Sequence, residues 1–102
     1  MKKFKNLVEN NSLIVSSEIL RAVAHPLRLK ILEFIDLNPN INVNKIYSSL
    51  QLEQSITSQH LRTLRDVGLV NAHREGKYIR YTINYNKIVH IITTVENFLD
   101  SE

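Results

Sequence analysis

The side chains best suited to contact another molecule lie in two polar segments in the second half of the chain. The first segment reads Gln-Ser-Ile-Thr-Ser-Gln from Gln54 onward. Glutamine can form two hydrogen bonds to adenine in the major groove of DNA, and serine or threonine can bond to bases or phosphates. The second segment, 74–80, holds basic side chains that could contact the DNA backbone or the adjacent minor groove. The predicted DNA contacts are Gln54, Ser55, Thr57, Ser58, Gln59, Arg62, Arg74, Lys77 and Arg80.

The net charge of the chain is concentrated in the same region. The 102 residues include 13 Lys and Arg against 10 Asp and Glu, which gives a net charge of +3. Residues 54–82 hold five basic and two acidic side chains, whereas the rest of the chain holds eight of each. Because a basic surface favours a polyanion, this distribution supports duplex DNA as a partner. A module whose basic face binds an acidic protein is the alternative from another functional class.

Helical spacing of apolar residues predicts the elements that position the first segment. A core helix starts at Pro26, and Asn42 is expected to cap the short helix that follows it. After a turn at 51–53, a second helix carries the polar segment and an apolar stripe that begins at Ile56. Gly68 lies just beyond this stripe, where a helix commonly ends. Two short helices joined by a tight turn predict a helix-turn-helix.

The pattern changes from helix to strand after the second of these helices. Residues 69–74 and 77–83 are typical of two strands, and the Glu75-Gly76 pair between them suits a tight hairpin turn. A hairpin that directly follows a helix-turn-helix is the order of elements in a winged helix. The sequence therefore predicts a mainly α fold with a small β-hairpin, a winged helix-turn-helix with five helices and a two-stranded wing. Residues 1–102 are long enough for one such domain.

Two flanking helices, at about 6–22 and about 86–99, carry more apolar surface than a small core can cover. Exposed stripes of this size usually mark an interface, and self-association is the simplest way to cover them. We therefore predict a homodimer held together by these two helices. The predicted interface residues are Leu13, Leu20, Ile88, Ile91, Ile92, Val95 and Leu99.

The composition excludes several classes of function. The chain has no cysteine, which excludes disulfides, thiolate metal sites and a cysteine nucleophile. There is no glycine-rich phosphate loop and no histidine paired with a carboxylate at a recognisable spacing, so we expect no enzymatic activity. Apolar runs are far shorter than the ~20 residues of a membrane span, and no signal peptide follows the basic N-terminus. We expect a cytoplasmic protein without a membrane partner.

Three stretches of the sequence carry motifs that occur together. The chain contains ILRAVAHPLRLKIL at 19–32, QSITSQHLRTLRDVGLV at 54–70 and REGKYIRYTI at 74–83. They resemble, in this order, the second helix, the recognition helix and the wing of the ArsR/SmtB family of bacterial winged-helix repressors. The resemblance implies a homodimer, joined by its first and last helices, that binds an operator and blocks transcription. It also implies groove contacts by Gln54, Ser55, Ser58, Gln59 and Arg62, and wing contacts by Lys77 and its neighbours.

The positions that bind metals in many members of this family carry other residues here. Asn42 and Asn44 stand where those members have cysteines at the start of the third helix. A second type of site in the family would fall on Asn84, Asn86, Asn97 and Asp100. Because neutral asparagine is a poor ligand for zinc-type ions, we expect no cofactor and no metal.

Two single residues also depart from the family pattern. Thr57 stands where a β-branched apolar residue is usual, and His25 replaces the acidic residue before Pro26, so no carboxylate can cap the core helix. None of the four histidines lies three or four residues from another, the spacing that would place two of them on one helical face. A regulator that senses a small molecule, or a metal held by scattered histidines, is the alternative to a cofactor-free repressor.

Overall fold

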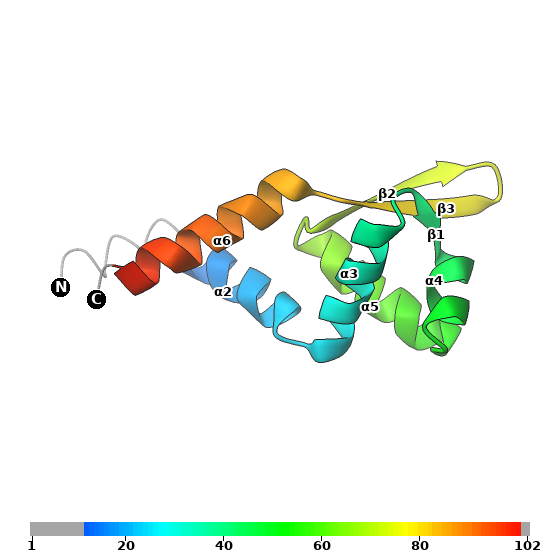
Figure 1. Cartoon of the computed structure of the whole chain (residues 1–102), viewed down its shortest axis with the longest axis horizontal. Coiled ribbons are helices and arrows are strands. Elements are labelled where there is room, and N and C mark those ends of the chain that lie inside the picture. Colours follow the sequence, from blue (N-terminus) through cyan, green and yellow to red (C-terminus); the bar gives the residue numbers. More distant parts are fainter. Residues whose placement is uncertain (1–11, 101–102) are drawn as a thin grey trace.

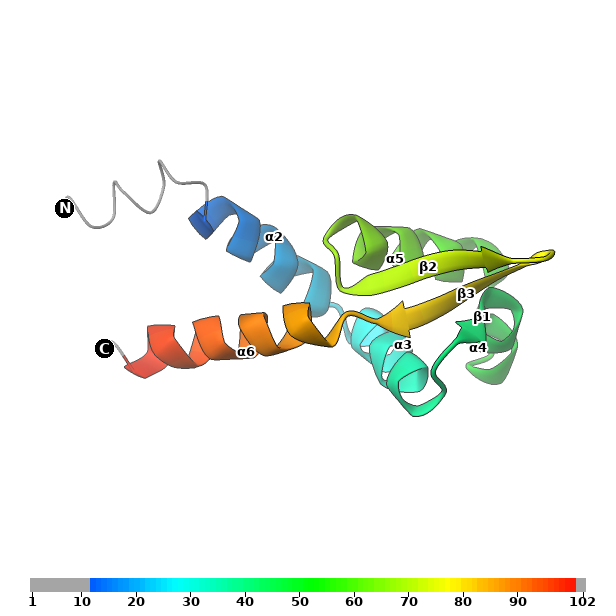
Figure 2. The same cartoon turned by 90° about the horizontal axis from the view of Figure 1, so that it is seen from above.

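The computed structural model describes residues 12–100, which form a body of three helices and a small sheet with a two-helix arm (Figures 1 and 2). The elements are α2 (Ser12–Val23), α3 (Pro26–Leu37), β1 (Ile41–Asn42), α4 (Val43–Ser49), α5 (Gln54–Asp66), β2 (Val70–Glu75), β3 (Tyr78–Ile83) and α6 (Tyr85–Asp100). The body runs from α3 to β3, and the arm consists of α2 and α6. The predicted winged helix-turn-helix is confirmed, with α4 and α5 as its helix pair.

One apolar core holds the three body helices against the sheet. The side chains that join them have no exposed surface and are Ile31, Ile35, Ile46, Leu61 and Leu64. Within α3 and α5 they recur at the spacing of an amphipathic face. Burial of a side chain of this size contributes roughly 1.5–3 kcal/mol, so the core fixes α5 firmly against α3 and α4.

The predicted wing is the hairpin of β2 and β3. Glu75 pairs with Tyr78, which leaves Gly76 and Lys77 as a two-residue turn. Gly76 has a φ of +64°, the left-handed conformation that such a turn requires. The turn therefore places the charge of Lys77 at the tip of the wing.

A third strand, β1, lies beside β3 and was not predicted. The sheet is antiparallel in the order β1-β3-β2, with Ile41 opposite Tyr81 and Asn42 opposite Arg80. A strand of two residues shows no alternation of polar and apolar side chains, so the sequence pattern cannot reveal it. It attaches the middle of β3 to the start of α4.

The turn after α5 fixes the direction in which the chain enters the wing. Gly68 has a φ of +81° and donates its N–H to the carbonyl of Arg65, while Leu69 donates to the carbonyl of Leu64, both at 2.9 Å. These two bonds satisfy carbonyls that the end of the helix leaves without partners. The predicted helix end at Gly68 is confirmed.

Side-chain caps define where two of the body helices begin. Asn42 caps α4 as predicted, because its Oδ1 accepts the N–H of Lys45 at 2.9 Å. His25 caps α3 without a carboxylate, since its Nδ1 accepts the N–H of Leu27 at 3.2 Å. An unprotonated imidazole nitrogen is a hydrogen-bond acceptor, so histidine can take over the role of the acidic residue.

The arm projects from the body, as Figures 1 and 2 show. The molecule measures 51 × 22 × 22 Å, and its radius of gyration of 15.7 Å exceeds the roughly 13 Å of a compact chain of this length. Ile19 and Ala22 are buried and attach α2 to the core. The flanking helices therefore extend outward from the body, and the N-terminal part of the predicted first helix lies outside the described residues.

Candidate nucleic-acid interface

The solvent-exposed face of α5 presents the polar residues that the sequence analysis selected. Ser55, Gln59 and Arg62 are exposed and recur at the spacing of one helical face. Gln54 and Ser58 are exposed beside them, in the first turns of the helix. The opposite face of α5 is buried in the core. These side chains therefore form a polar surface on one face of a helix that the core holds in place.

Thr57 is not part of this surface, so the prediction that it contacts DNA is wrong. Its exposed fraction is 0%, and its hydroxyl donates to the carbonyl of Glu53 at 2.9 Å. Thr57 shares the inward face with Leu61, four residues further on. Thr57 thus takes the buried position of the β-branched apolar residue that is usual here in the family. Its hydroxyl can be buried because it bonds to a carbonyl of the same helix.

Ile56 shows the reverse error. The apolar pattern places it in the buried stripe, but 40% of its surface is exposed, on the flank of the polar face of α5. An apolar side chain there can contact the methyl group of thymine. Helical spacing could have identified Thr57 as the inward residue, because it lies four and seven residues before Leu61 and Leu64, whereas Ile56 lies five and eight before them.

The wing carries three basic side chains in two different situations. Arg74 and Lys77 are exposed, and the Lys77 ammonium lies 5.4 Å from the centre of the Tyr78 ring. Arg80 is half-buried: its Nε lies 3.0 Å from Oε2 of Glu75, and its Nη1 donates to the carbonyl of Asn40 at 3.1 Å. Arg74 and Lys77 are thus available to a ligand, whereas Arg80 holds the wing to the loop before β1.

Two asparagines at the positions compared with metal ligands serve as structural residues. Asn42 is the cap of α4 described above. Asn84 accepts the N–H of Lys87 at 3.2 Å and donates to the carbonyl of Gly68 at 3.0 Å, so it connects the end of α5 with the start of α6. Within residues 12–100, no group of three or more His, Cys, Asp or Glu side chains could hold a metal ion.

His60, on the inner flank of α5, lies in a cluster of basic groups. Its Nδ1 accepts a hydrogen bond from Nε of Arg28 at 3.2 Å, and its ring centre lies 4.7 Å from that of His25. Burial lowers the pKa of His60 below its ordinary value of 6.5, and the nearby His25 and Arg28 lower this pKa further. The folded protein therefore favours the neutral form of His60, which provides the acceptor for Arg28.

This lowered pKa predicts that acid destabilises the fold through His60. Well above pH 6.5 His60 is neutral in both states, and as the pH falls toward that value the unfolded chain binds the proton first. The free energy of unfolding should fall as the pH drops toward the pKa of the folded state. Urea titrations between about pH 7.5 and pH 5 should show that the free energy of unfolding falls more steeply for the wild type than for His60→Asn. Parallel losses in the two proteins would contradict this role of His60.

The predicted dimer residues separate into two groups. Leu20 and Ile92 are 43% and 52% exposed, and Val89, which the sequence analysis missed, is 60% exposed. Ile88 and Ile91 form the second group: they are half-buried and pack against the core of their own chain. Val89 lies three residues before Ile92 on the same side of α6, and this spacing could have identified it. The side chains of Leu13, Val95 and Leu99 lie outside what the structure describes.

Comparison with known sequences identifies relatives along most of the chain. Residues 25–72 match the family described as "Bacterial regulatory protein, arsR family". The transcriptional repressor PagR of Bacillus anthracis is 39% identical over 85 residues, which are 83% of this chain and 85% of PagR. The transcriptional regulator YgaV of Escherichia coli is 34% identical over 82 residues, 80% of this chain and 83% of YgaV. Both are transcription regulators, in agreement with the expectation of a non-enzymatic protein.

Solved structures show the same architecture. The crystal structure of PagR aligns with a TM-score of 0.68 at 38% identity, over 82% of this chain and 95% of PagR. A homodimeric winged helix-turn-helix DNA-binding domain of Mycobacterium bovis aligns with a TM-score of 0.74, over 92% of this chain and 86% of that domain. Its 24% identity supports a common fold only. Within residues 12–100, no helix is both long and apolar enough to cross a bilayer. The fold, the exposed face of α5 and the similarity to PagR and YgaV together show that the chain belongs to the ArsR family of bacterial regulatory proteins.

Proposed function

We propose that this protein is a cytoplasmic, homodimeric repressor that binds an inverted repeat in duplex DNA. The observation that carries the proposal is the exposed polar face of α5, formed by Ser55, Gln59 and Arg62 and supported by a buried core. In this account α5 enters the major groove, where Gln59 reads a base and Ser55 and Arg62 contact bases or phosphates. Repression is favoured because PagR is described as a repressor.

The wing supplies the second part of the contact. Arg74 and Lys77 are exposed on the hairpin, and α5 leads into β2 through the short turn at Gly68. Figures 1 and 2 show the tip of the wing and the start of α5 at the same end of the molecule, away from α2 and α6. Basic side chains on the wing would neutralise phosphates and add affinity that is independent of sequence.

The arm provides the means to dimerise. Leu20, Val89 and Ile92 expose apolar surface on α2 and α6, away from the proposed DNA contacts. A symmetric pair of arms would bury these side chains and place two recognition helices about one turn of DNA apart, ~34 Å. The Mycobacterium bovis domain shows that this fold can form a homodimer.

Selection of binding sites from random duplex DNA tests the proposal directly. The selected sequences should contain two half-sites in inverted orientation, and the same motif should appear with zinc or with a chelator because no metal takes part. A single half-site would argue against the dimer. Failure to enrich any sequence would argue against DNA recognition and would favour a protein partner for the basic face.

Two variants separate base reading from phosphate binding. Gln59→Ala should reduce discrimination at one base pair by ~1–3 kcal/mol, because it removes paired hydrogen bonds to a base. Lys77→Ala should weaken binding to all sequences alike and reduce the slope of log affinity against log salt by about one. Competition binding on the selected site and on its single-base variants measures both effects. Equal behaviour of the two variants would show that this division of roles is wrong.

A further inference from the structure

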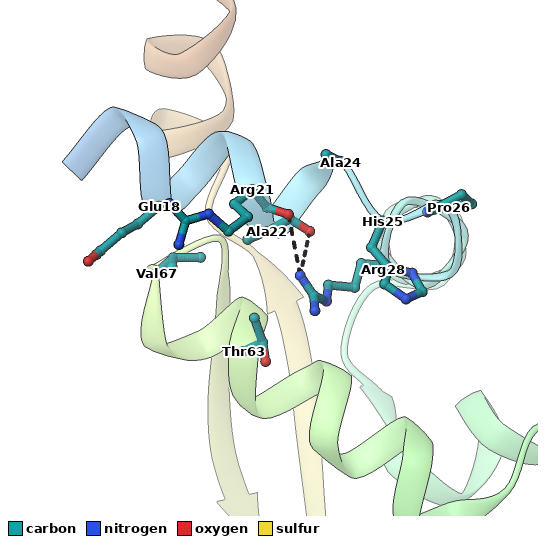
Figure 3. A pocket seen from close by; sticks show the side chains of 9 residues that line it. All are labelled: Glu18, Arg21, Ala22, Ala24, His25, Pro26, Arg28, Thr63 and Val67. Carbon is teal, nitrogen blue, oxygen red and sulfur yellow. Dashed lines mark hydrogen bonds between the residues drawn. The ribbon is translucent and has the colours of Figure 1, made fainter. Parts of the chain in front are cut away.

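Arg28, in the first turn of α3, connects three helices through its guanidinium group. Its Nη1 donates to the carbonyls of Arg21 at 3.4 Å and Ala22 at 3.2 Å, in the last turn of α2 (dashed lines in Figure 3). Its Nε donates to Nδ1 of His60, on α5, at 3.2 Å. One side chain therefore joins the arm, the body and the recognition helix.

Both sets of contacts suit a guanidinium group. The last carbonyls of a helix lack intrahelical partners and carry partial negative charge, so α2 offers acceptors to a cation. His60 offers an acceptor only while its Nδ1 is unprotonated, and the charged or titratable groups facing it, His25 and Arg28, both disfavour its protonation. Arg28 is half-buried, and a hydrogen bond is stronger there than in water.

Buried Ile19 and Ala22 hold α2 to the core, and the bonds of Arg28 add a polar link between α2 and α5. A cavity of about 550 Å³ lies at this junction, lined by Ala22 on α2 and by Thr63 and Val67 on α5 (Figure 3). In the part of the chain that the structure describes, no side chain other than Arg28 hydrogen-bonds to both α2 and α5.

We propose that Arg28 is a positioning residue for DNA recognition, which holds α2 of the arm at a defined angle to the recognition helix. This inference rests on the proposed function, since it concerns how a dimer presents two copies of α5. The half-site spacing that a dimer accepts depends on the distance and angle between its recognition helices. Arg28 thereby selects the spacing between half-sites without touching a base.

The test uses the inverted repeat obtained by selection and two derivatives with one base pair added to or removed from the spacer. The wild type should prefer the selected spacer over both derivatives by about tenfold or more. Arg28→Gln should reduce this preference to less than about threefold, because a neutral amide cannot span both sets of acceptors. Arg28→Lys should reduce it similarly, since a single ammonium replaces the planar fork. The base preference within each half-site should not change.

A matched pair of variants at His60 tests the same link from the other helix. His60→Asn keeps an acceptor near the position of Nδ1 and should retain the spacing preference of the wild type. His60→Leu removes the acceptor and should lose the preference as Arg28→Gln does. Circular dichroism and thermal unfolding of each variant show whether it is folded. If Arg28→Gln does not fold, the comparison of the two His60 variants decides.

The possible failures are distinguishable. A folded Arg28→Gln protein that keeps the wild-type spacing preference overturns the positioning role but leaves the proposed function intact. Equal spacing preferences in His60→Asn and His60→Leu overturn the role in the same way. If the wild type binds no duplex at all, the proposed function and this inference both fail.

Discussion

Ile92→Glu should convert the dimer into monomers of 11.9 kDa and remove specific binding to the operator. Ile92 is 52% exposed on α6, beside Val89, at the proposed contact between two arms. A carboxylate there would have to lose its hydration on association without gaining a partner, a cost that a small interface cannot offset. Because a monomer contacts one half-site, affinity for the inverted repeat should fall at least about a hundredfold. Sedimentation equilibrium and gel-shift titration measure the two effects.

Asn97→Glu is the matched control for this variant. Asn97 is exposed on the same helix but lies on a different side from Ile92, so the same added charge should leave the dimer intact. Unchanged mass for Ile92→Glu would mean that the apolar face of α6 is not the dimer contact. Monomers in both variants would mean that the charge acts through the whole helix and not through this face.

Leu61→Ala should destabilise the fold by ~2–5 kcal/mol, because it leaves a cavity at the centre of the core. Leu61 has no exposed surface and joins α5 to the other body helices. Such a loss is a large share of the 5–15 kcal/mol, roughly, that stabilises a domain of ordinary size. The midpoint of urea unfolding should fall accordingly, and the residual folded protein should bind DNA with the wild-type preference for bases.

Arg62→Ala, at the residue after Leu61, should weaken DNA binding and leave the stability of the fold nearly unchanged. Arg62 is exposed, so its loss should change the free energy of unfolding by less than about 0.5 kcal/mol while it weakens DNA binding. The contrast between adjacent residues separates the inward face of α5 from its outward face. Equal destabilisation by the two variants would contradict the burial pattern of this helix.

The helix-turn-helix and the wing could be predicted from the sequence because each has a periodic apolar pattern and a glycine at its boundary. Gly68 and Gly76 mark the two turns at which the chain changes direction, and both adopt left-handed backbone conformations. The strand β1 could not be predicted, since two residues have no period. Residue polarity was misleading at Ile56 and Thr57, because the hydroxyl of Thr57 bonds to its own helix and so tolerates burial.

The links between elements were the least accessible to sequence reasoning. Arg28 and His60 lie far apart in the chain, and neither belongs to an apolar pattern or to a motif that predicts their contact. The cap at His25 was missed for a related reason, since imidazole is an uncommon N-cap residue. Contacts of this kind depend on where whole helices lie relative to one another, which only the folded structure supplies.

The asparagine caps have a consequence for attempts to engineer a metal-responsive regulator on this scaffold. Asn42→Cys would introduce a thiolate but remove the side chain that caps α4. The free energy of unfolding would therefore fall by about 0.5–2 kcal/mol before any metal is bound. Asn84→Asp is the less disruptive exchange, because aspartate also caps helices and a carboxylate can coordinate zinc. It would nevertheless give up the donor to the carbonyl of Gly68, the bond that fastens the recognition helix to α6. Any metal introduced there would therefore bind at a junction between α5 and α6 that the same substitution had already weakened.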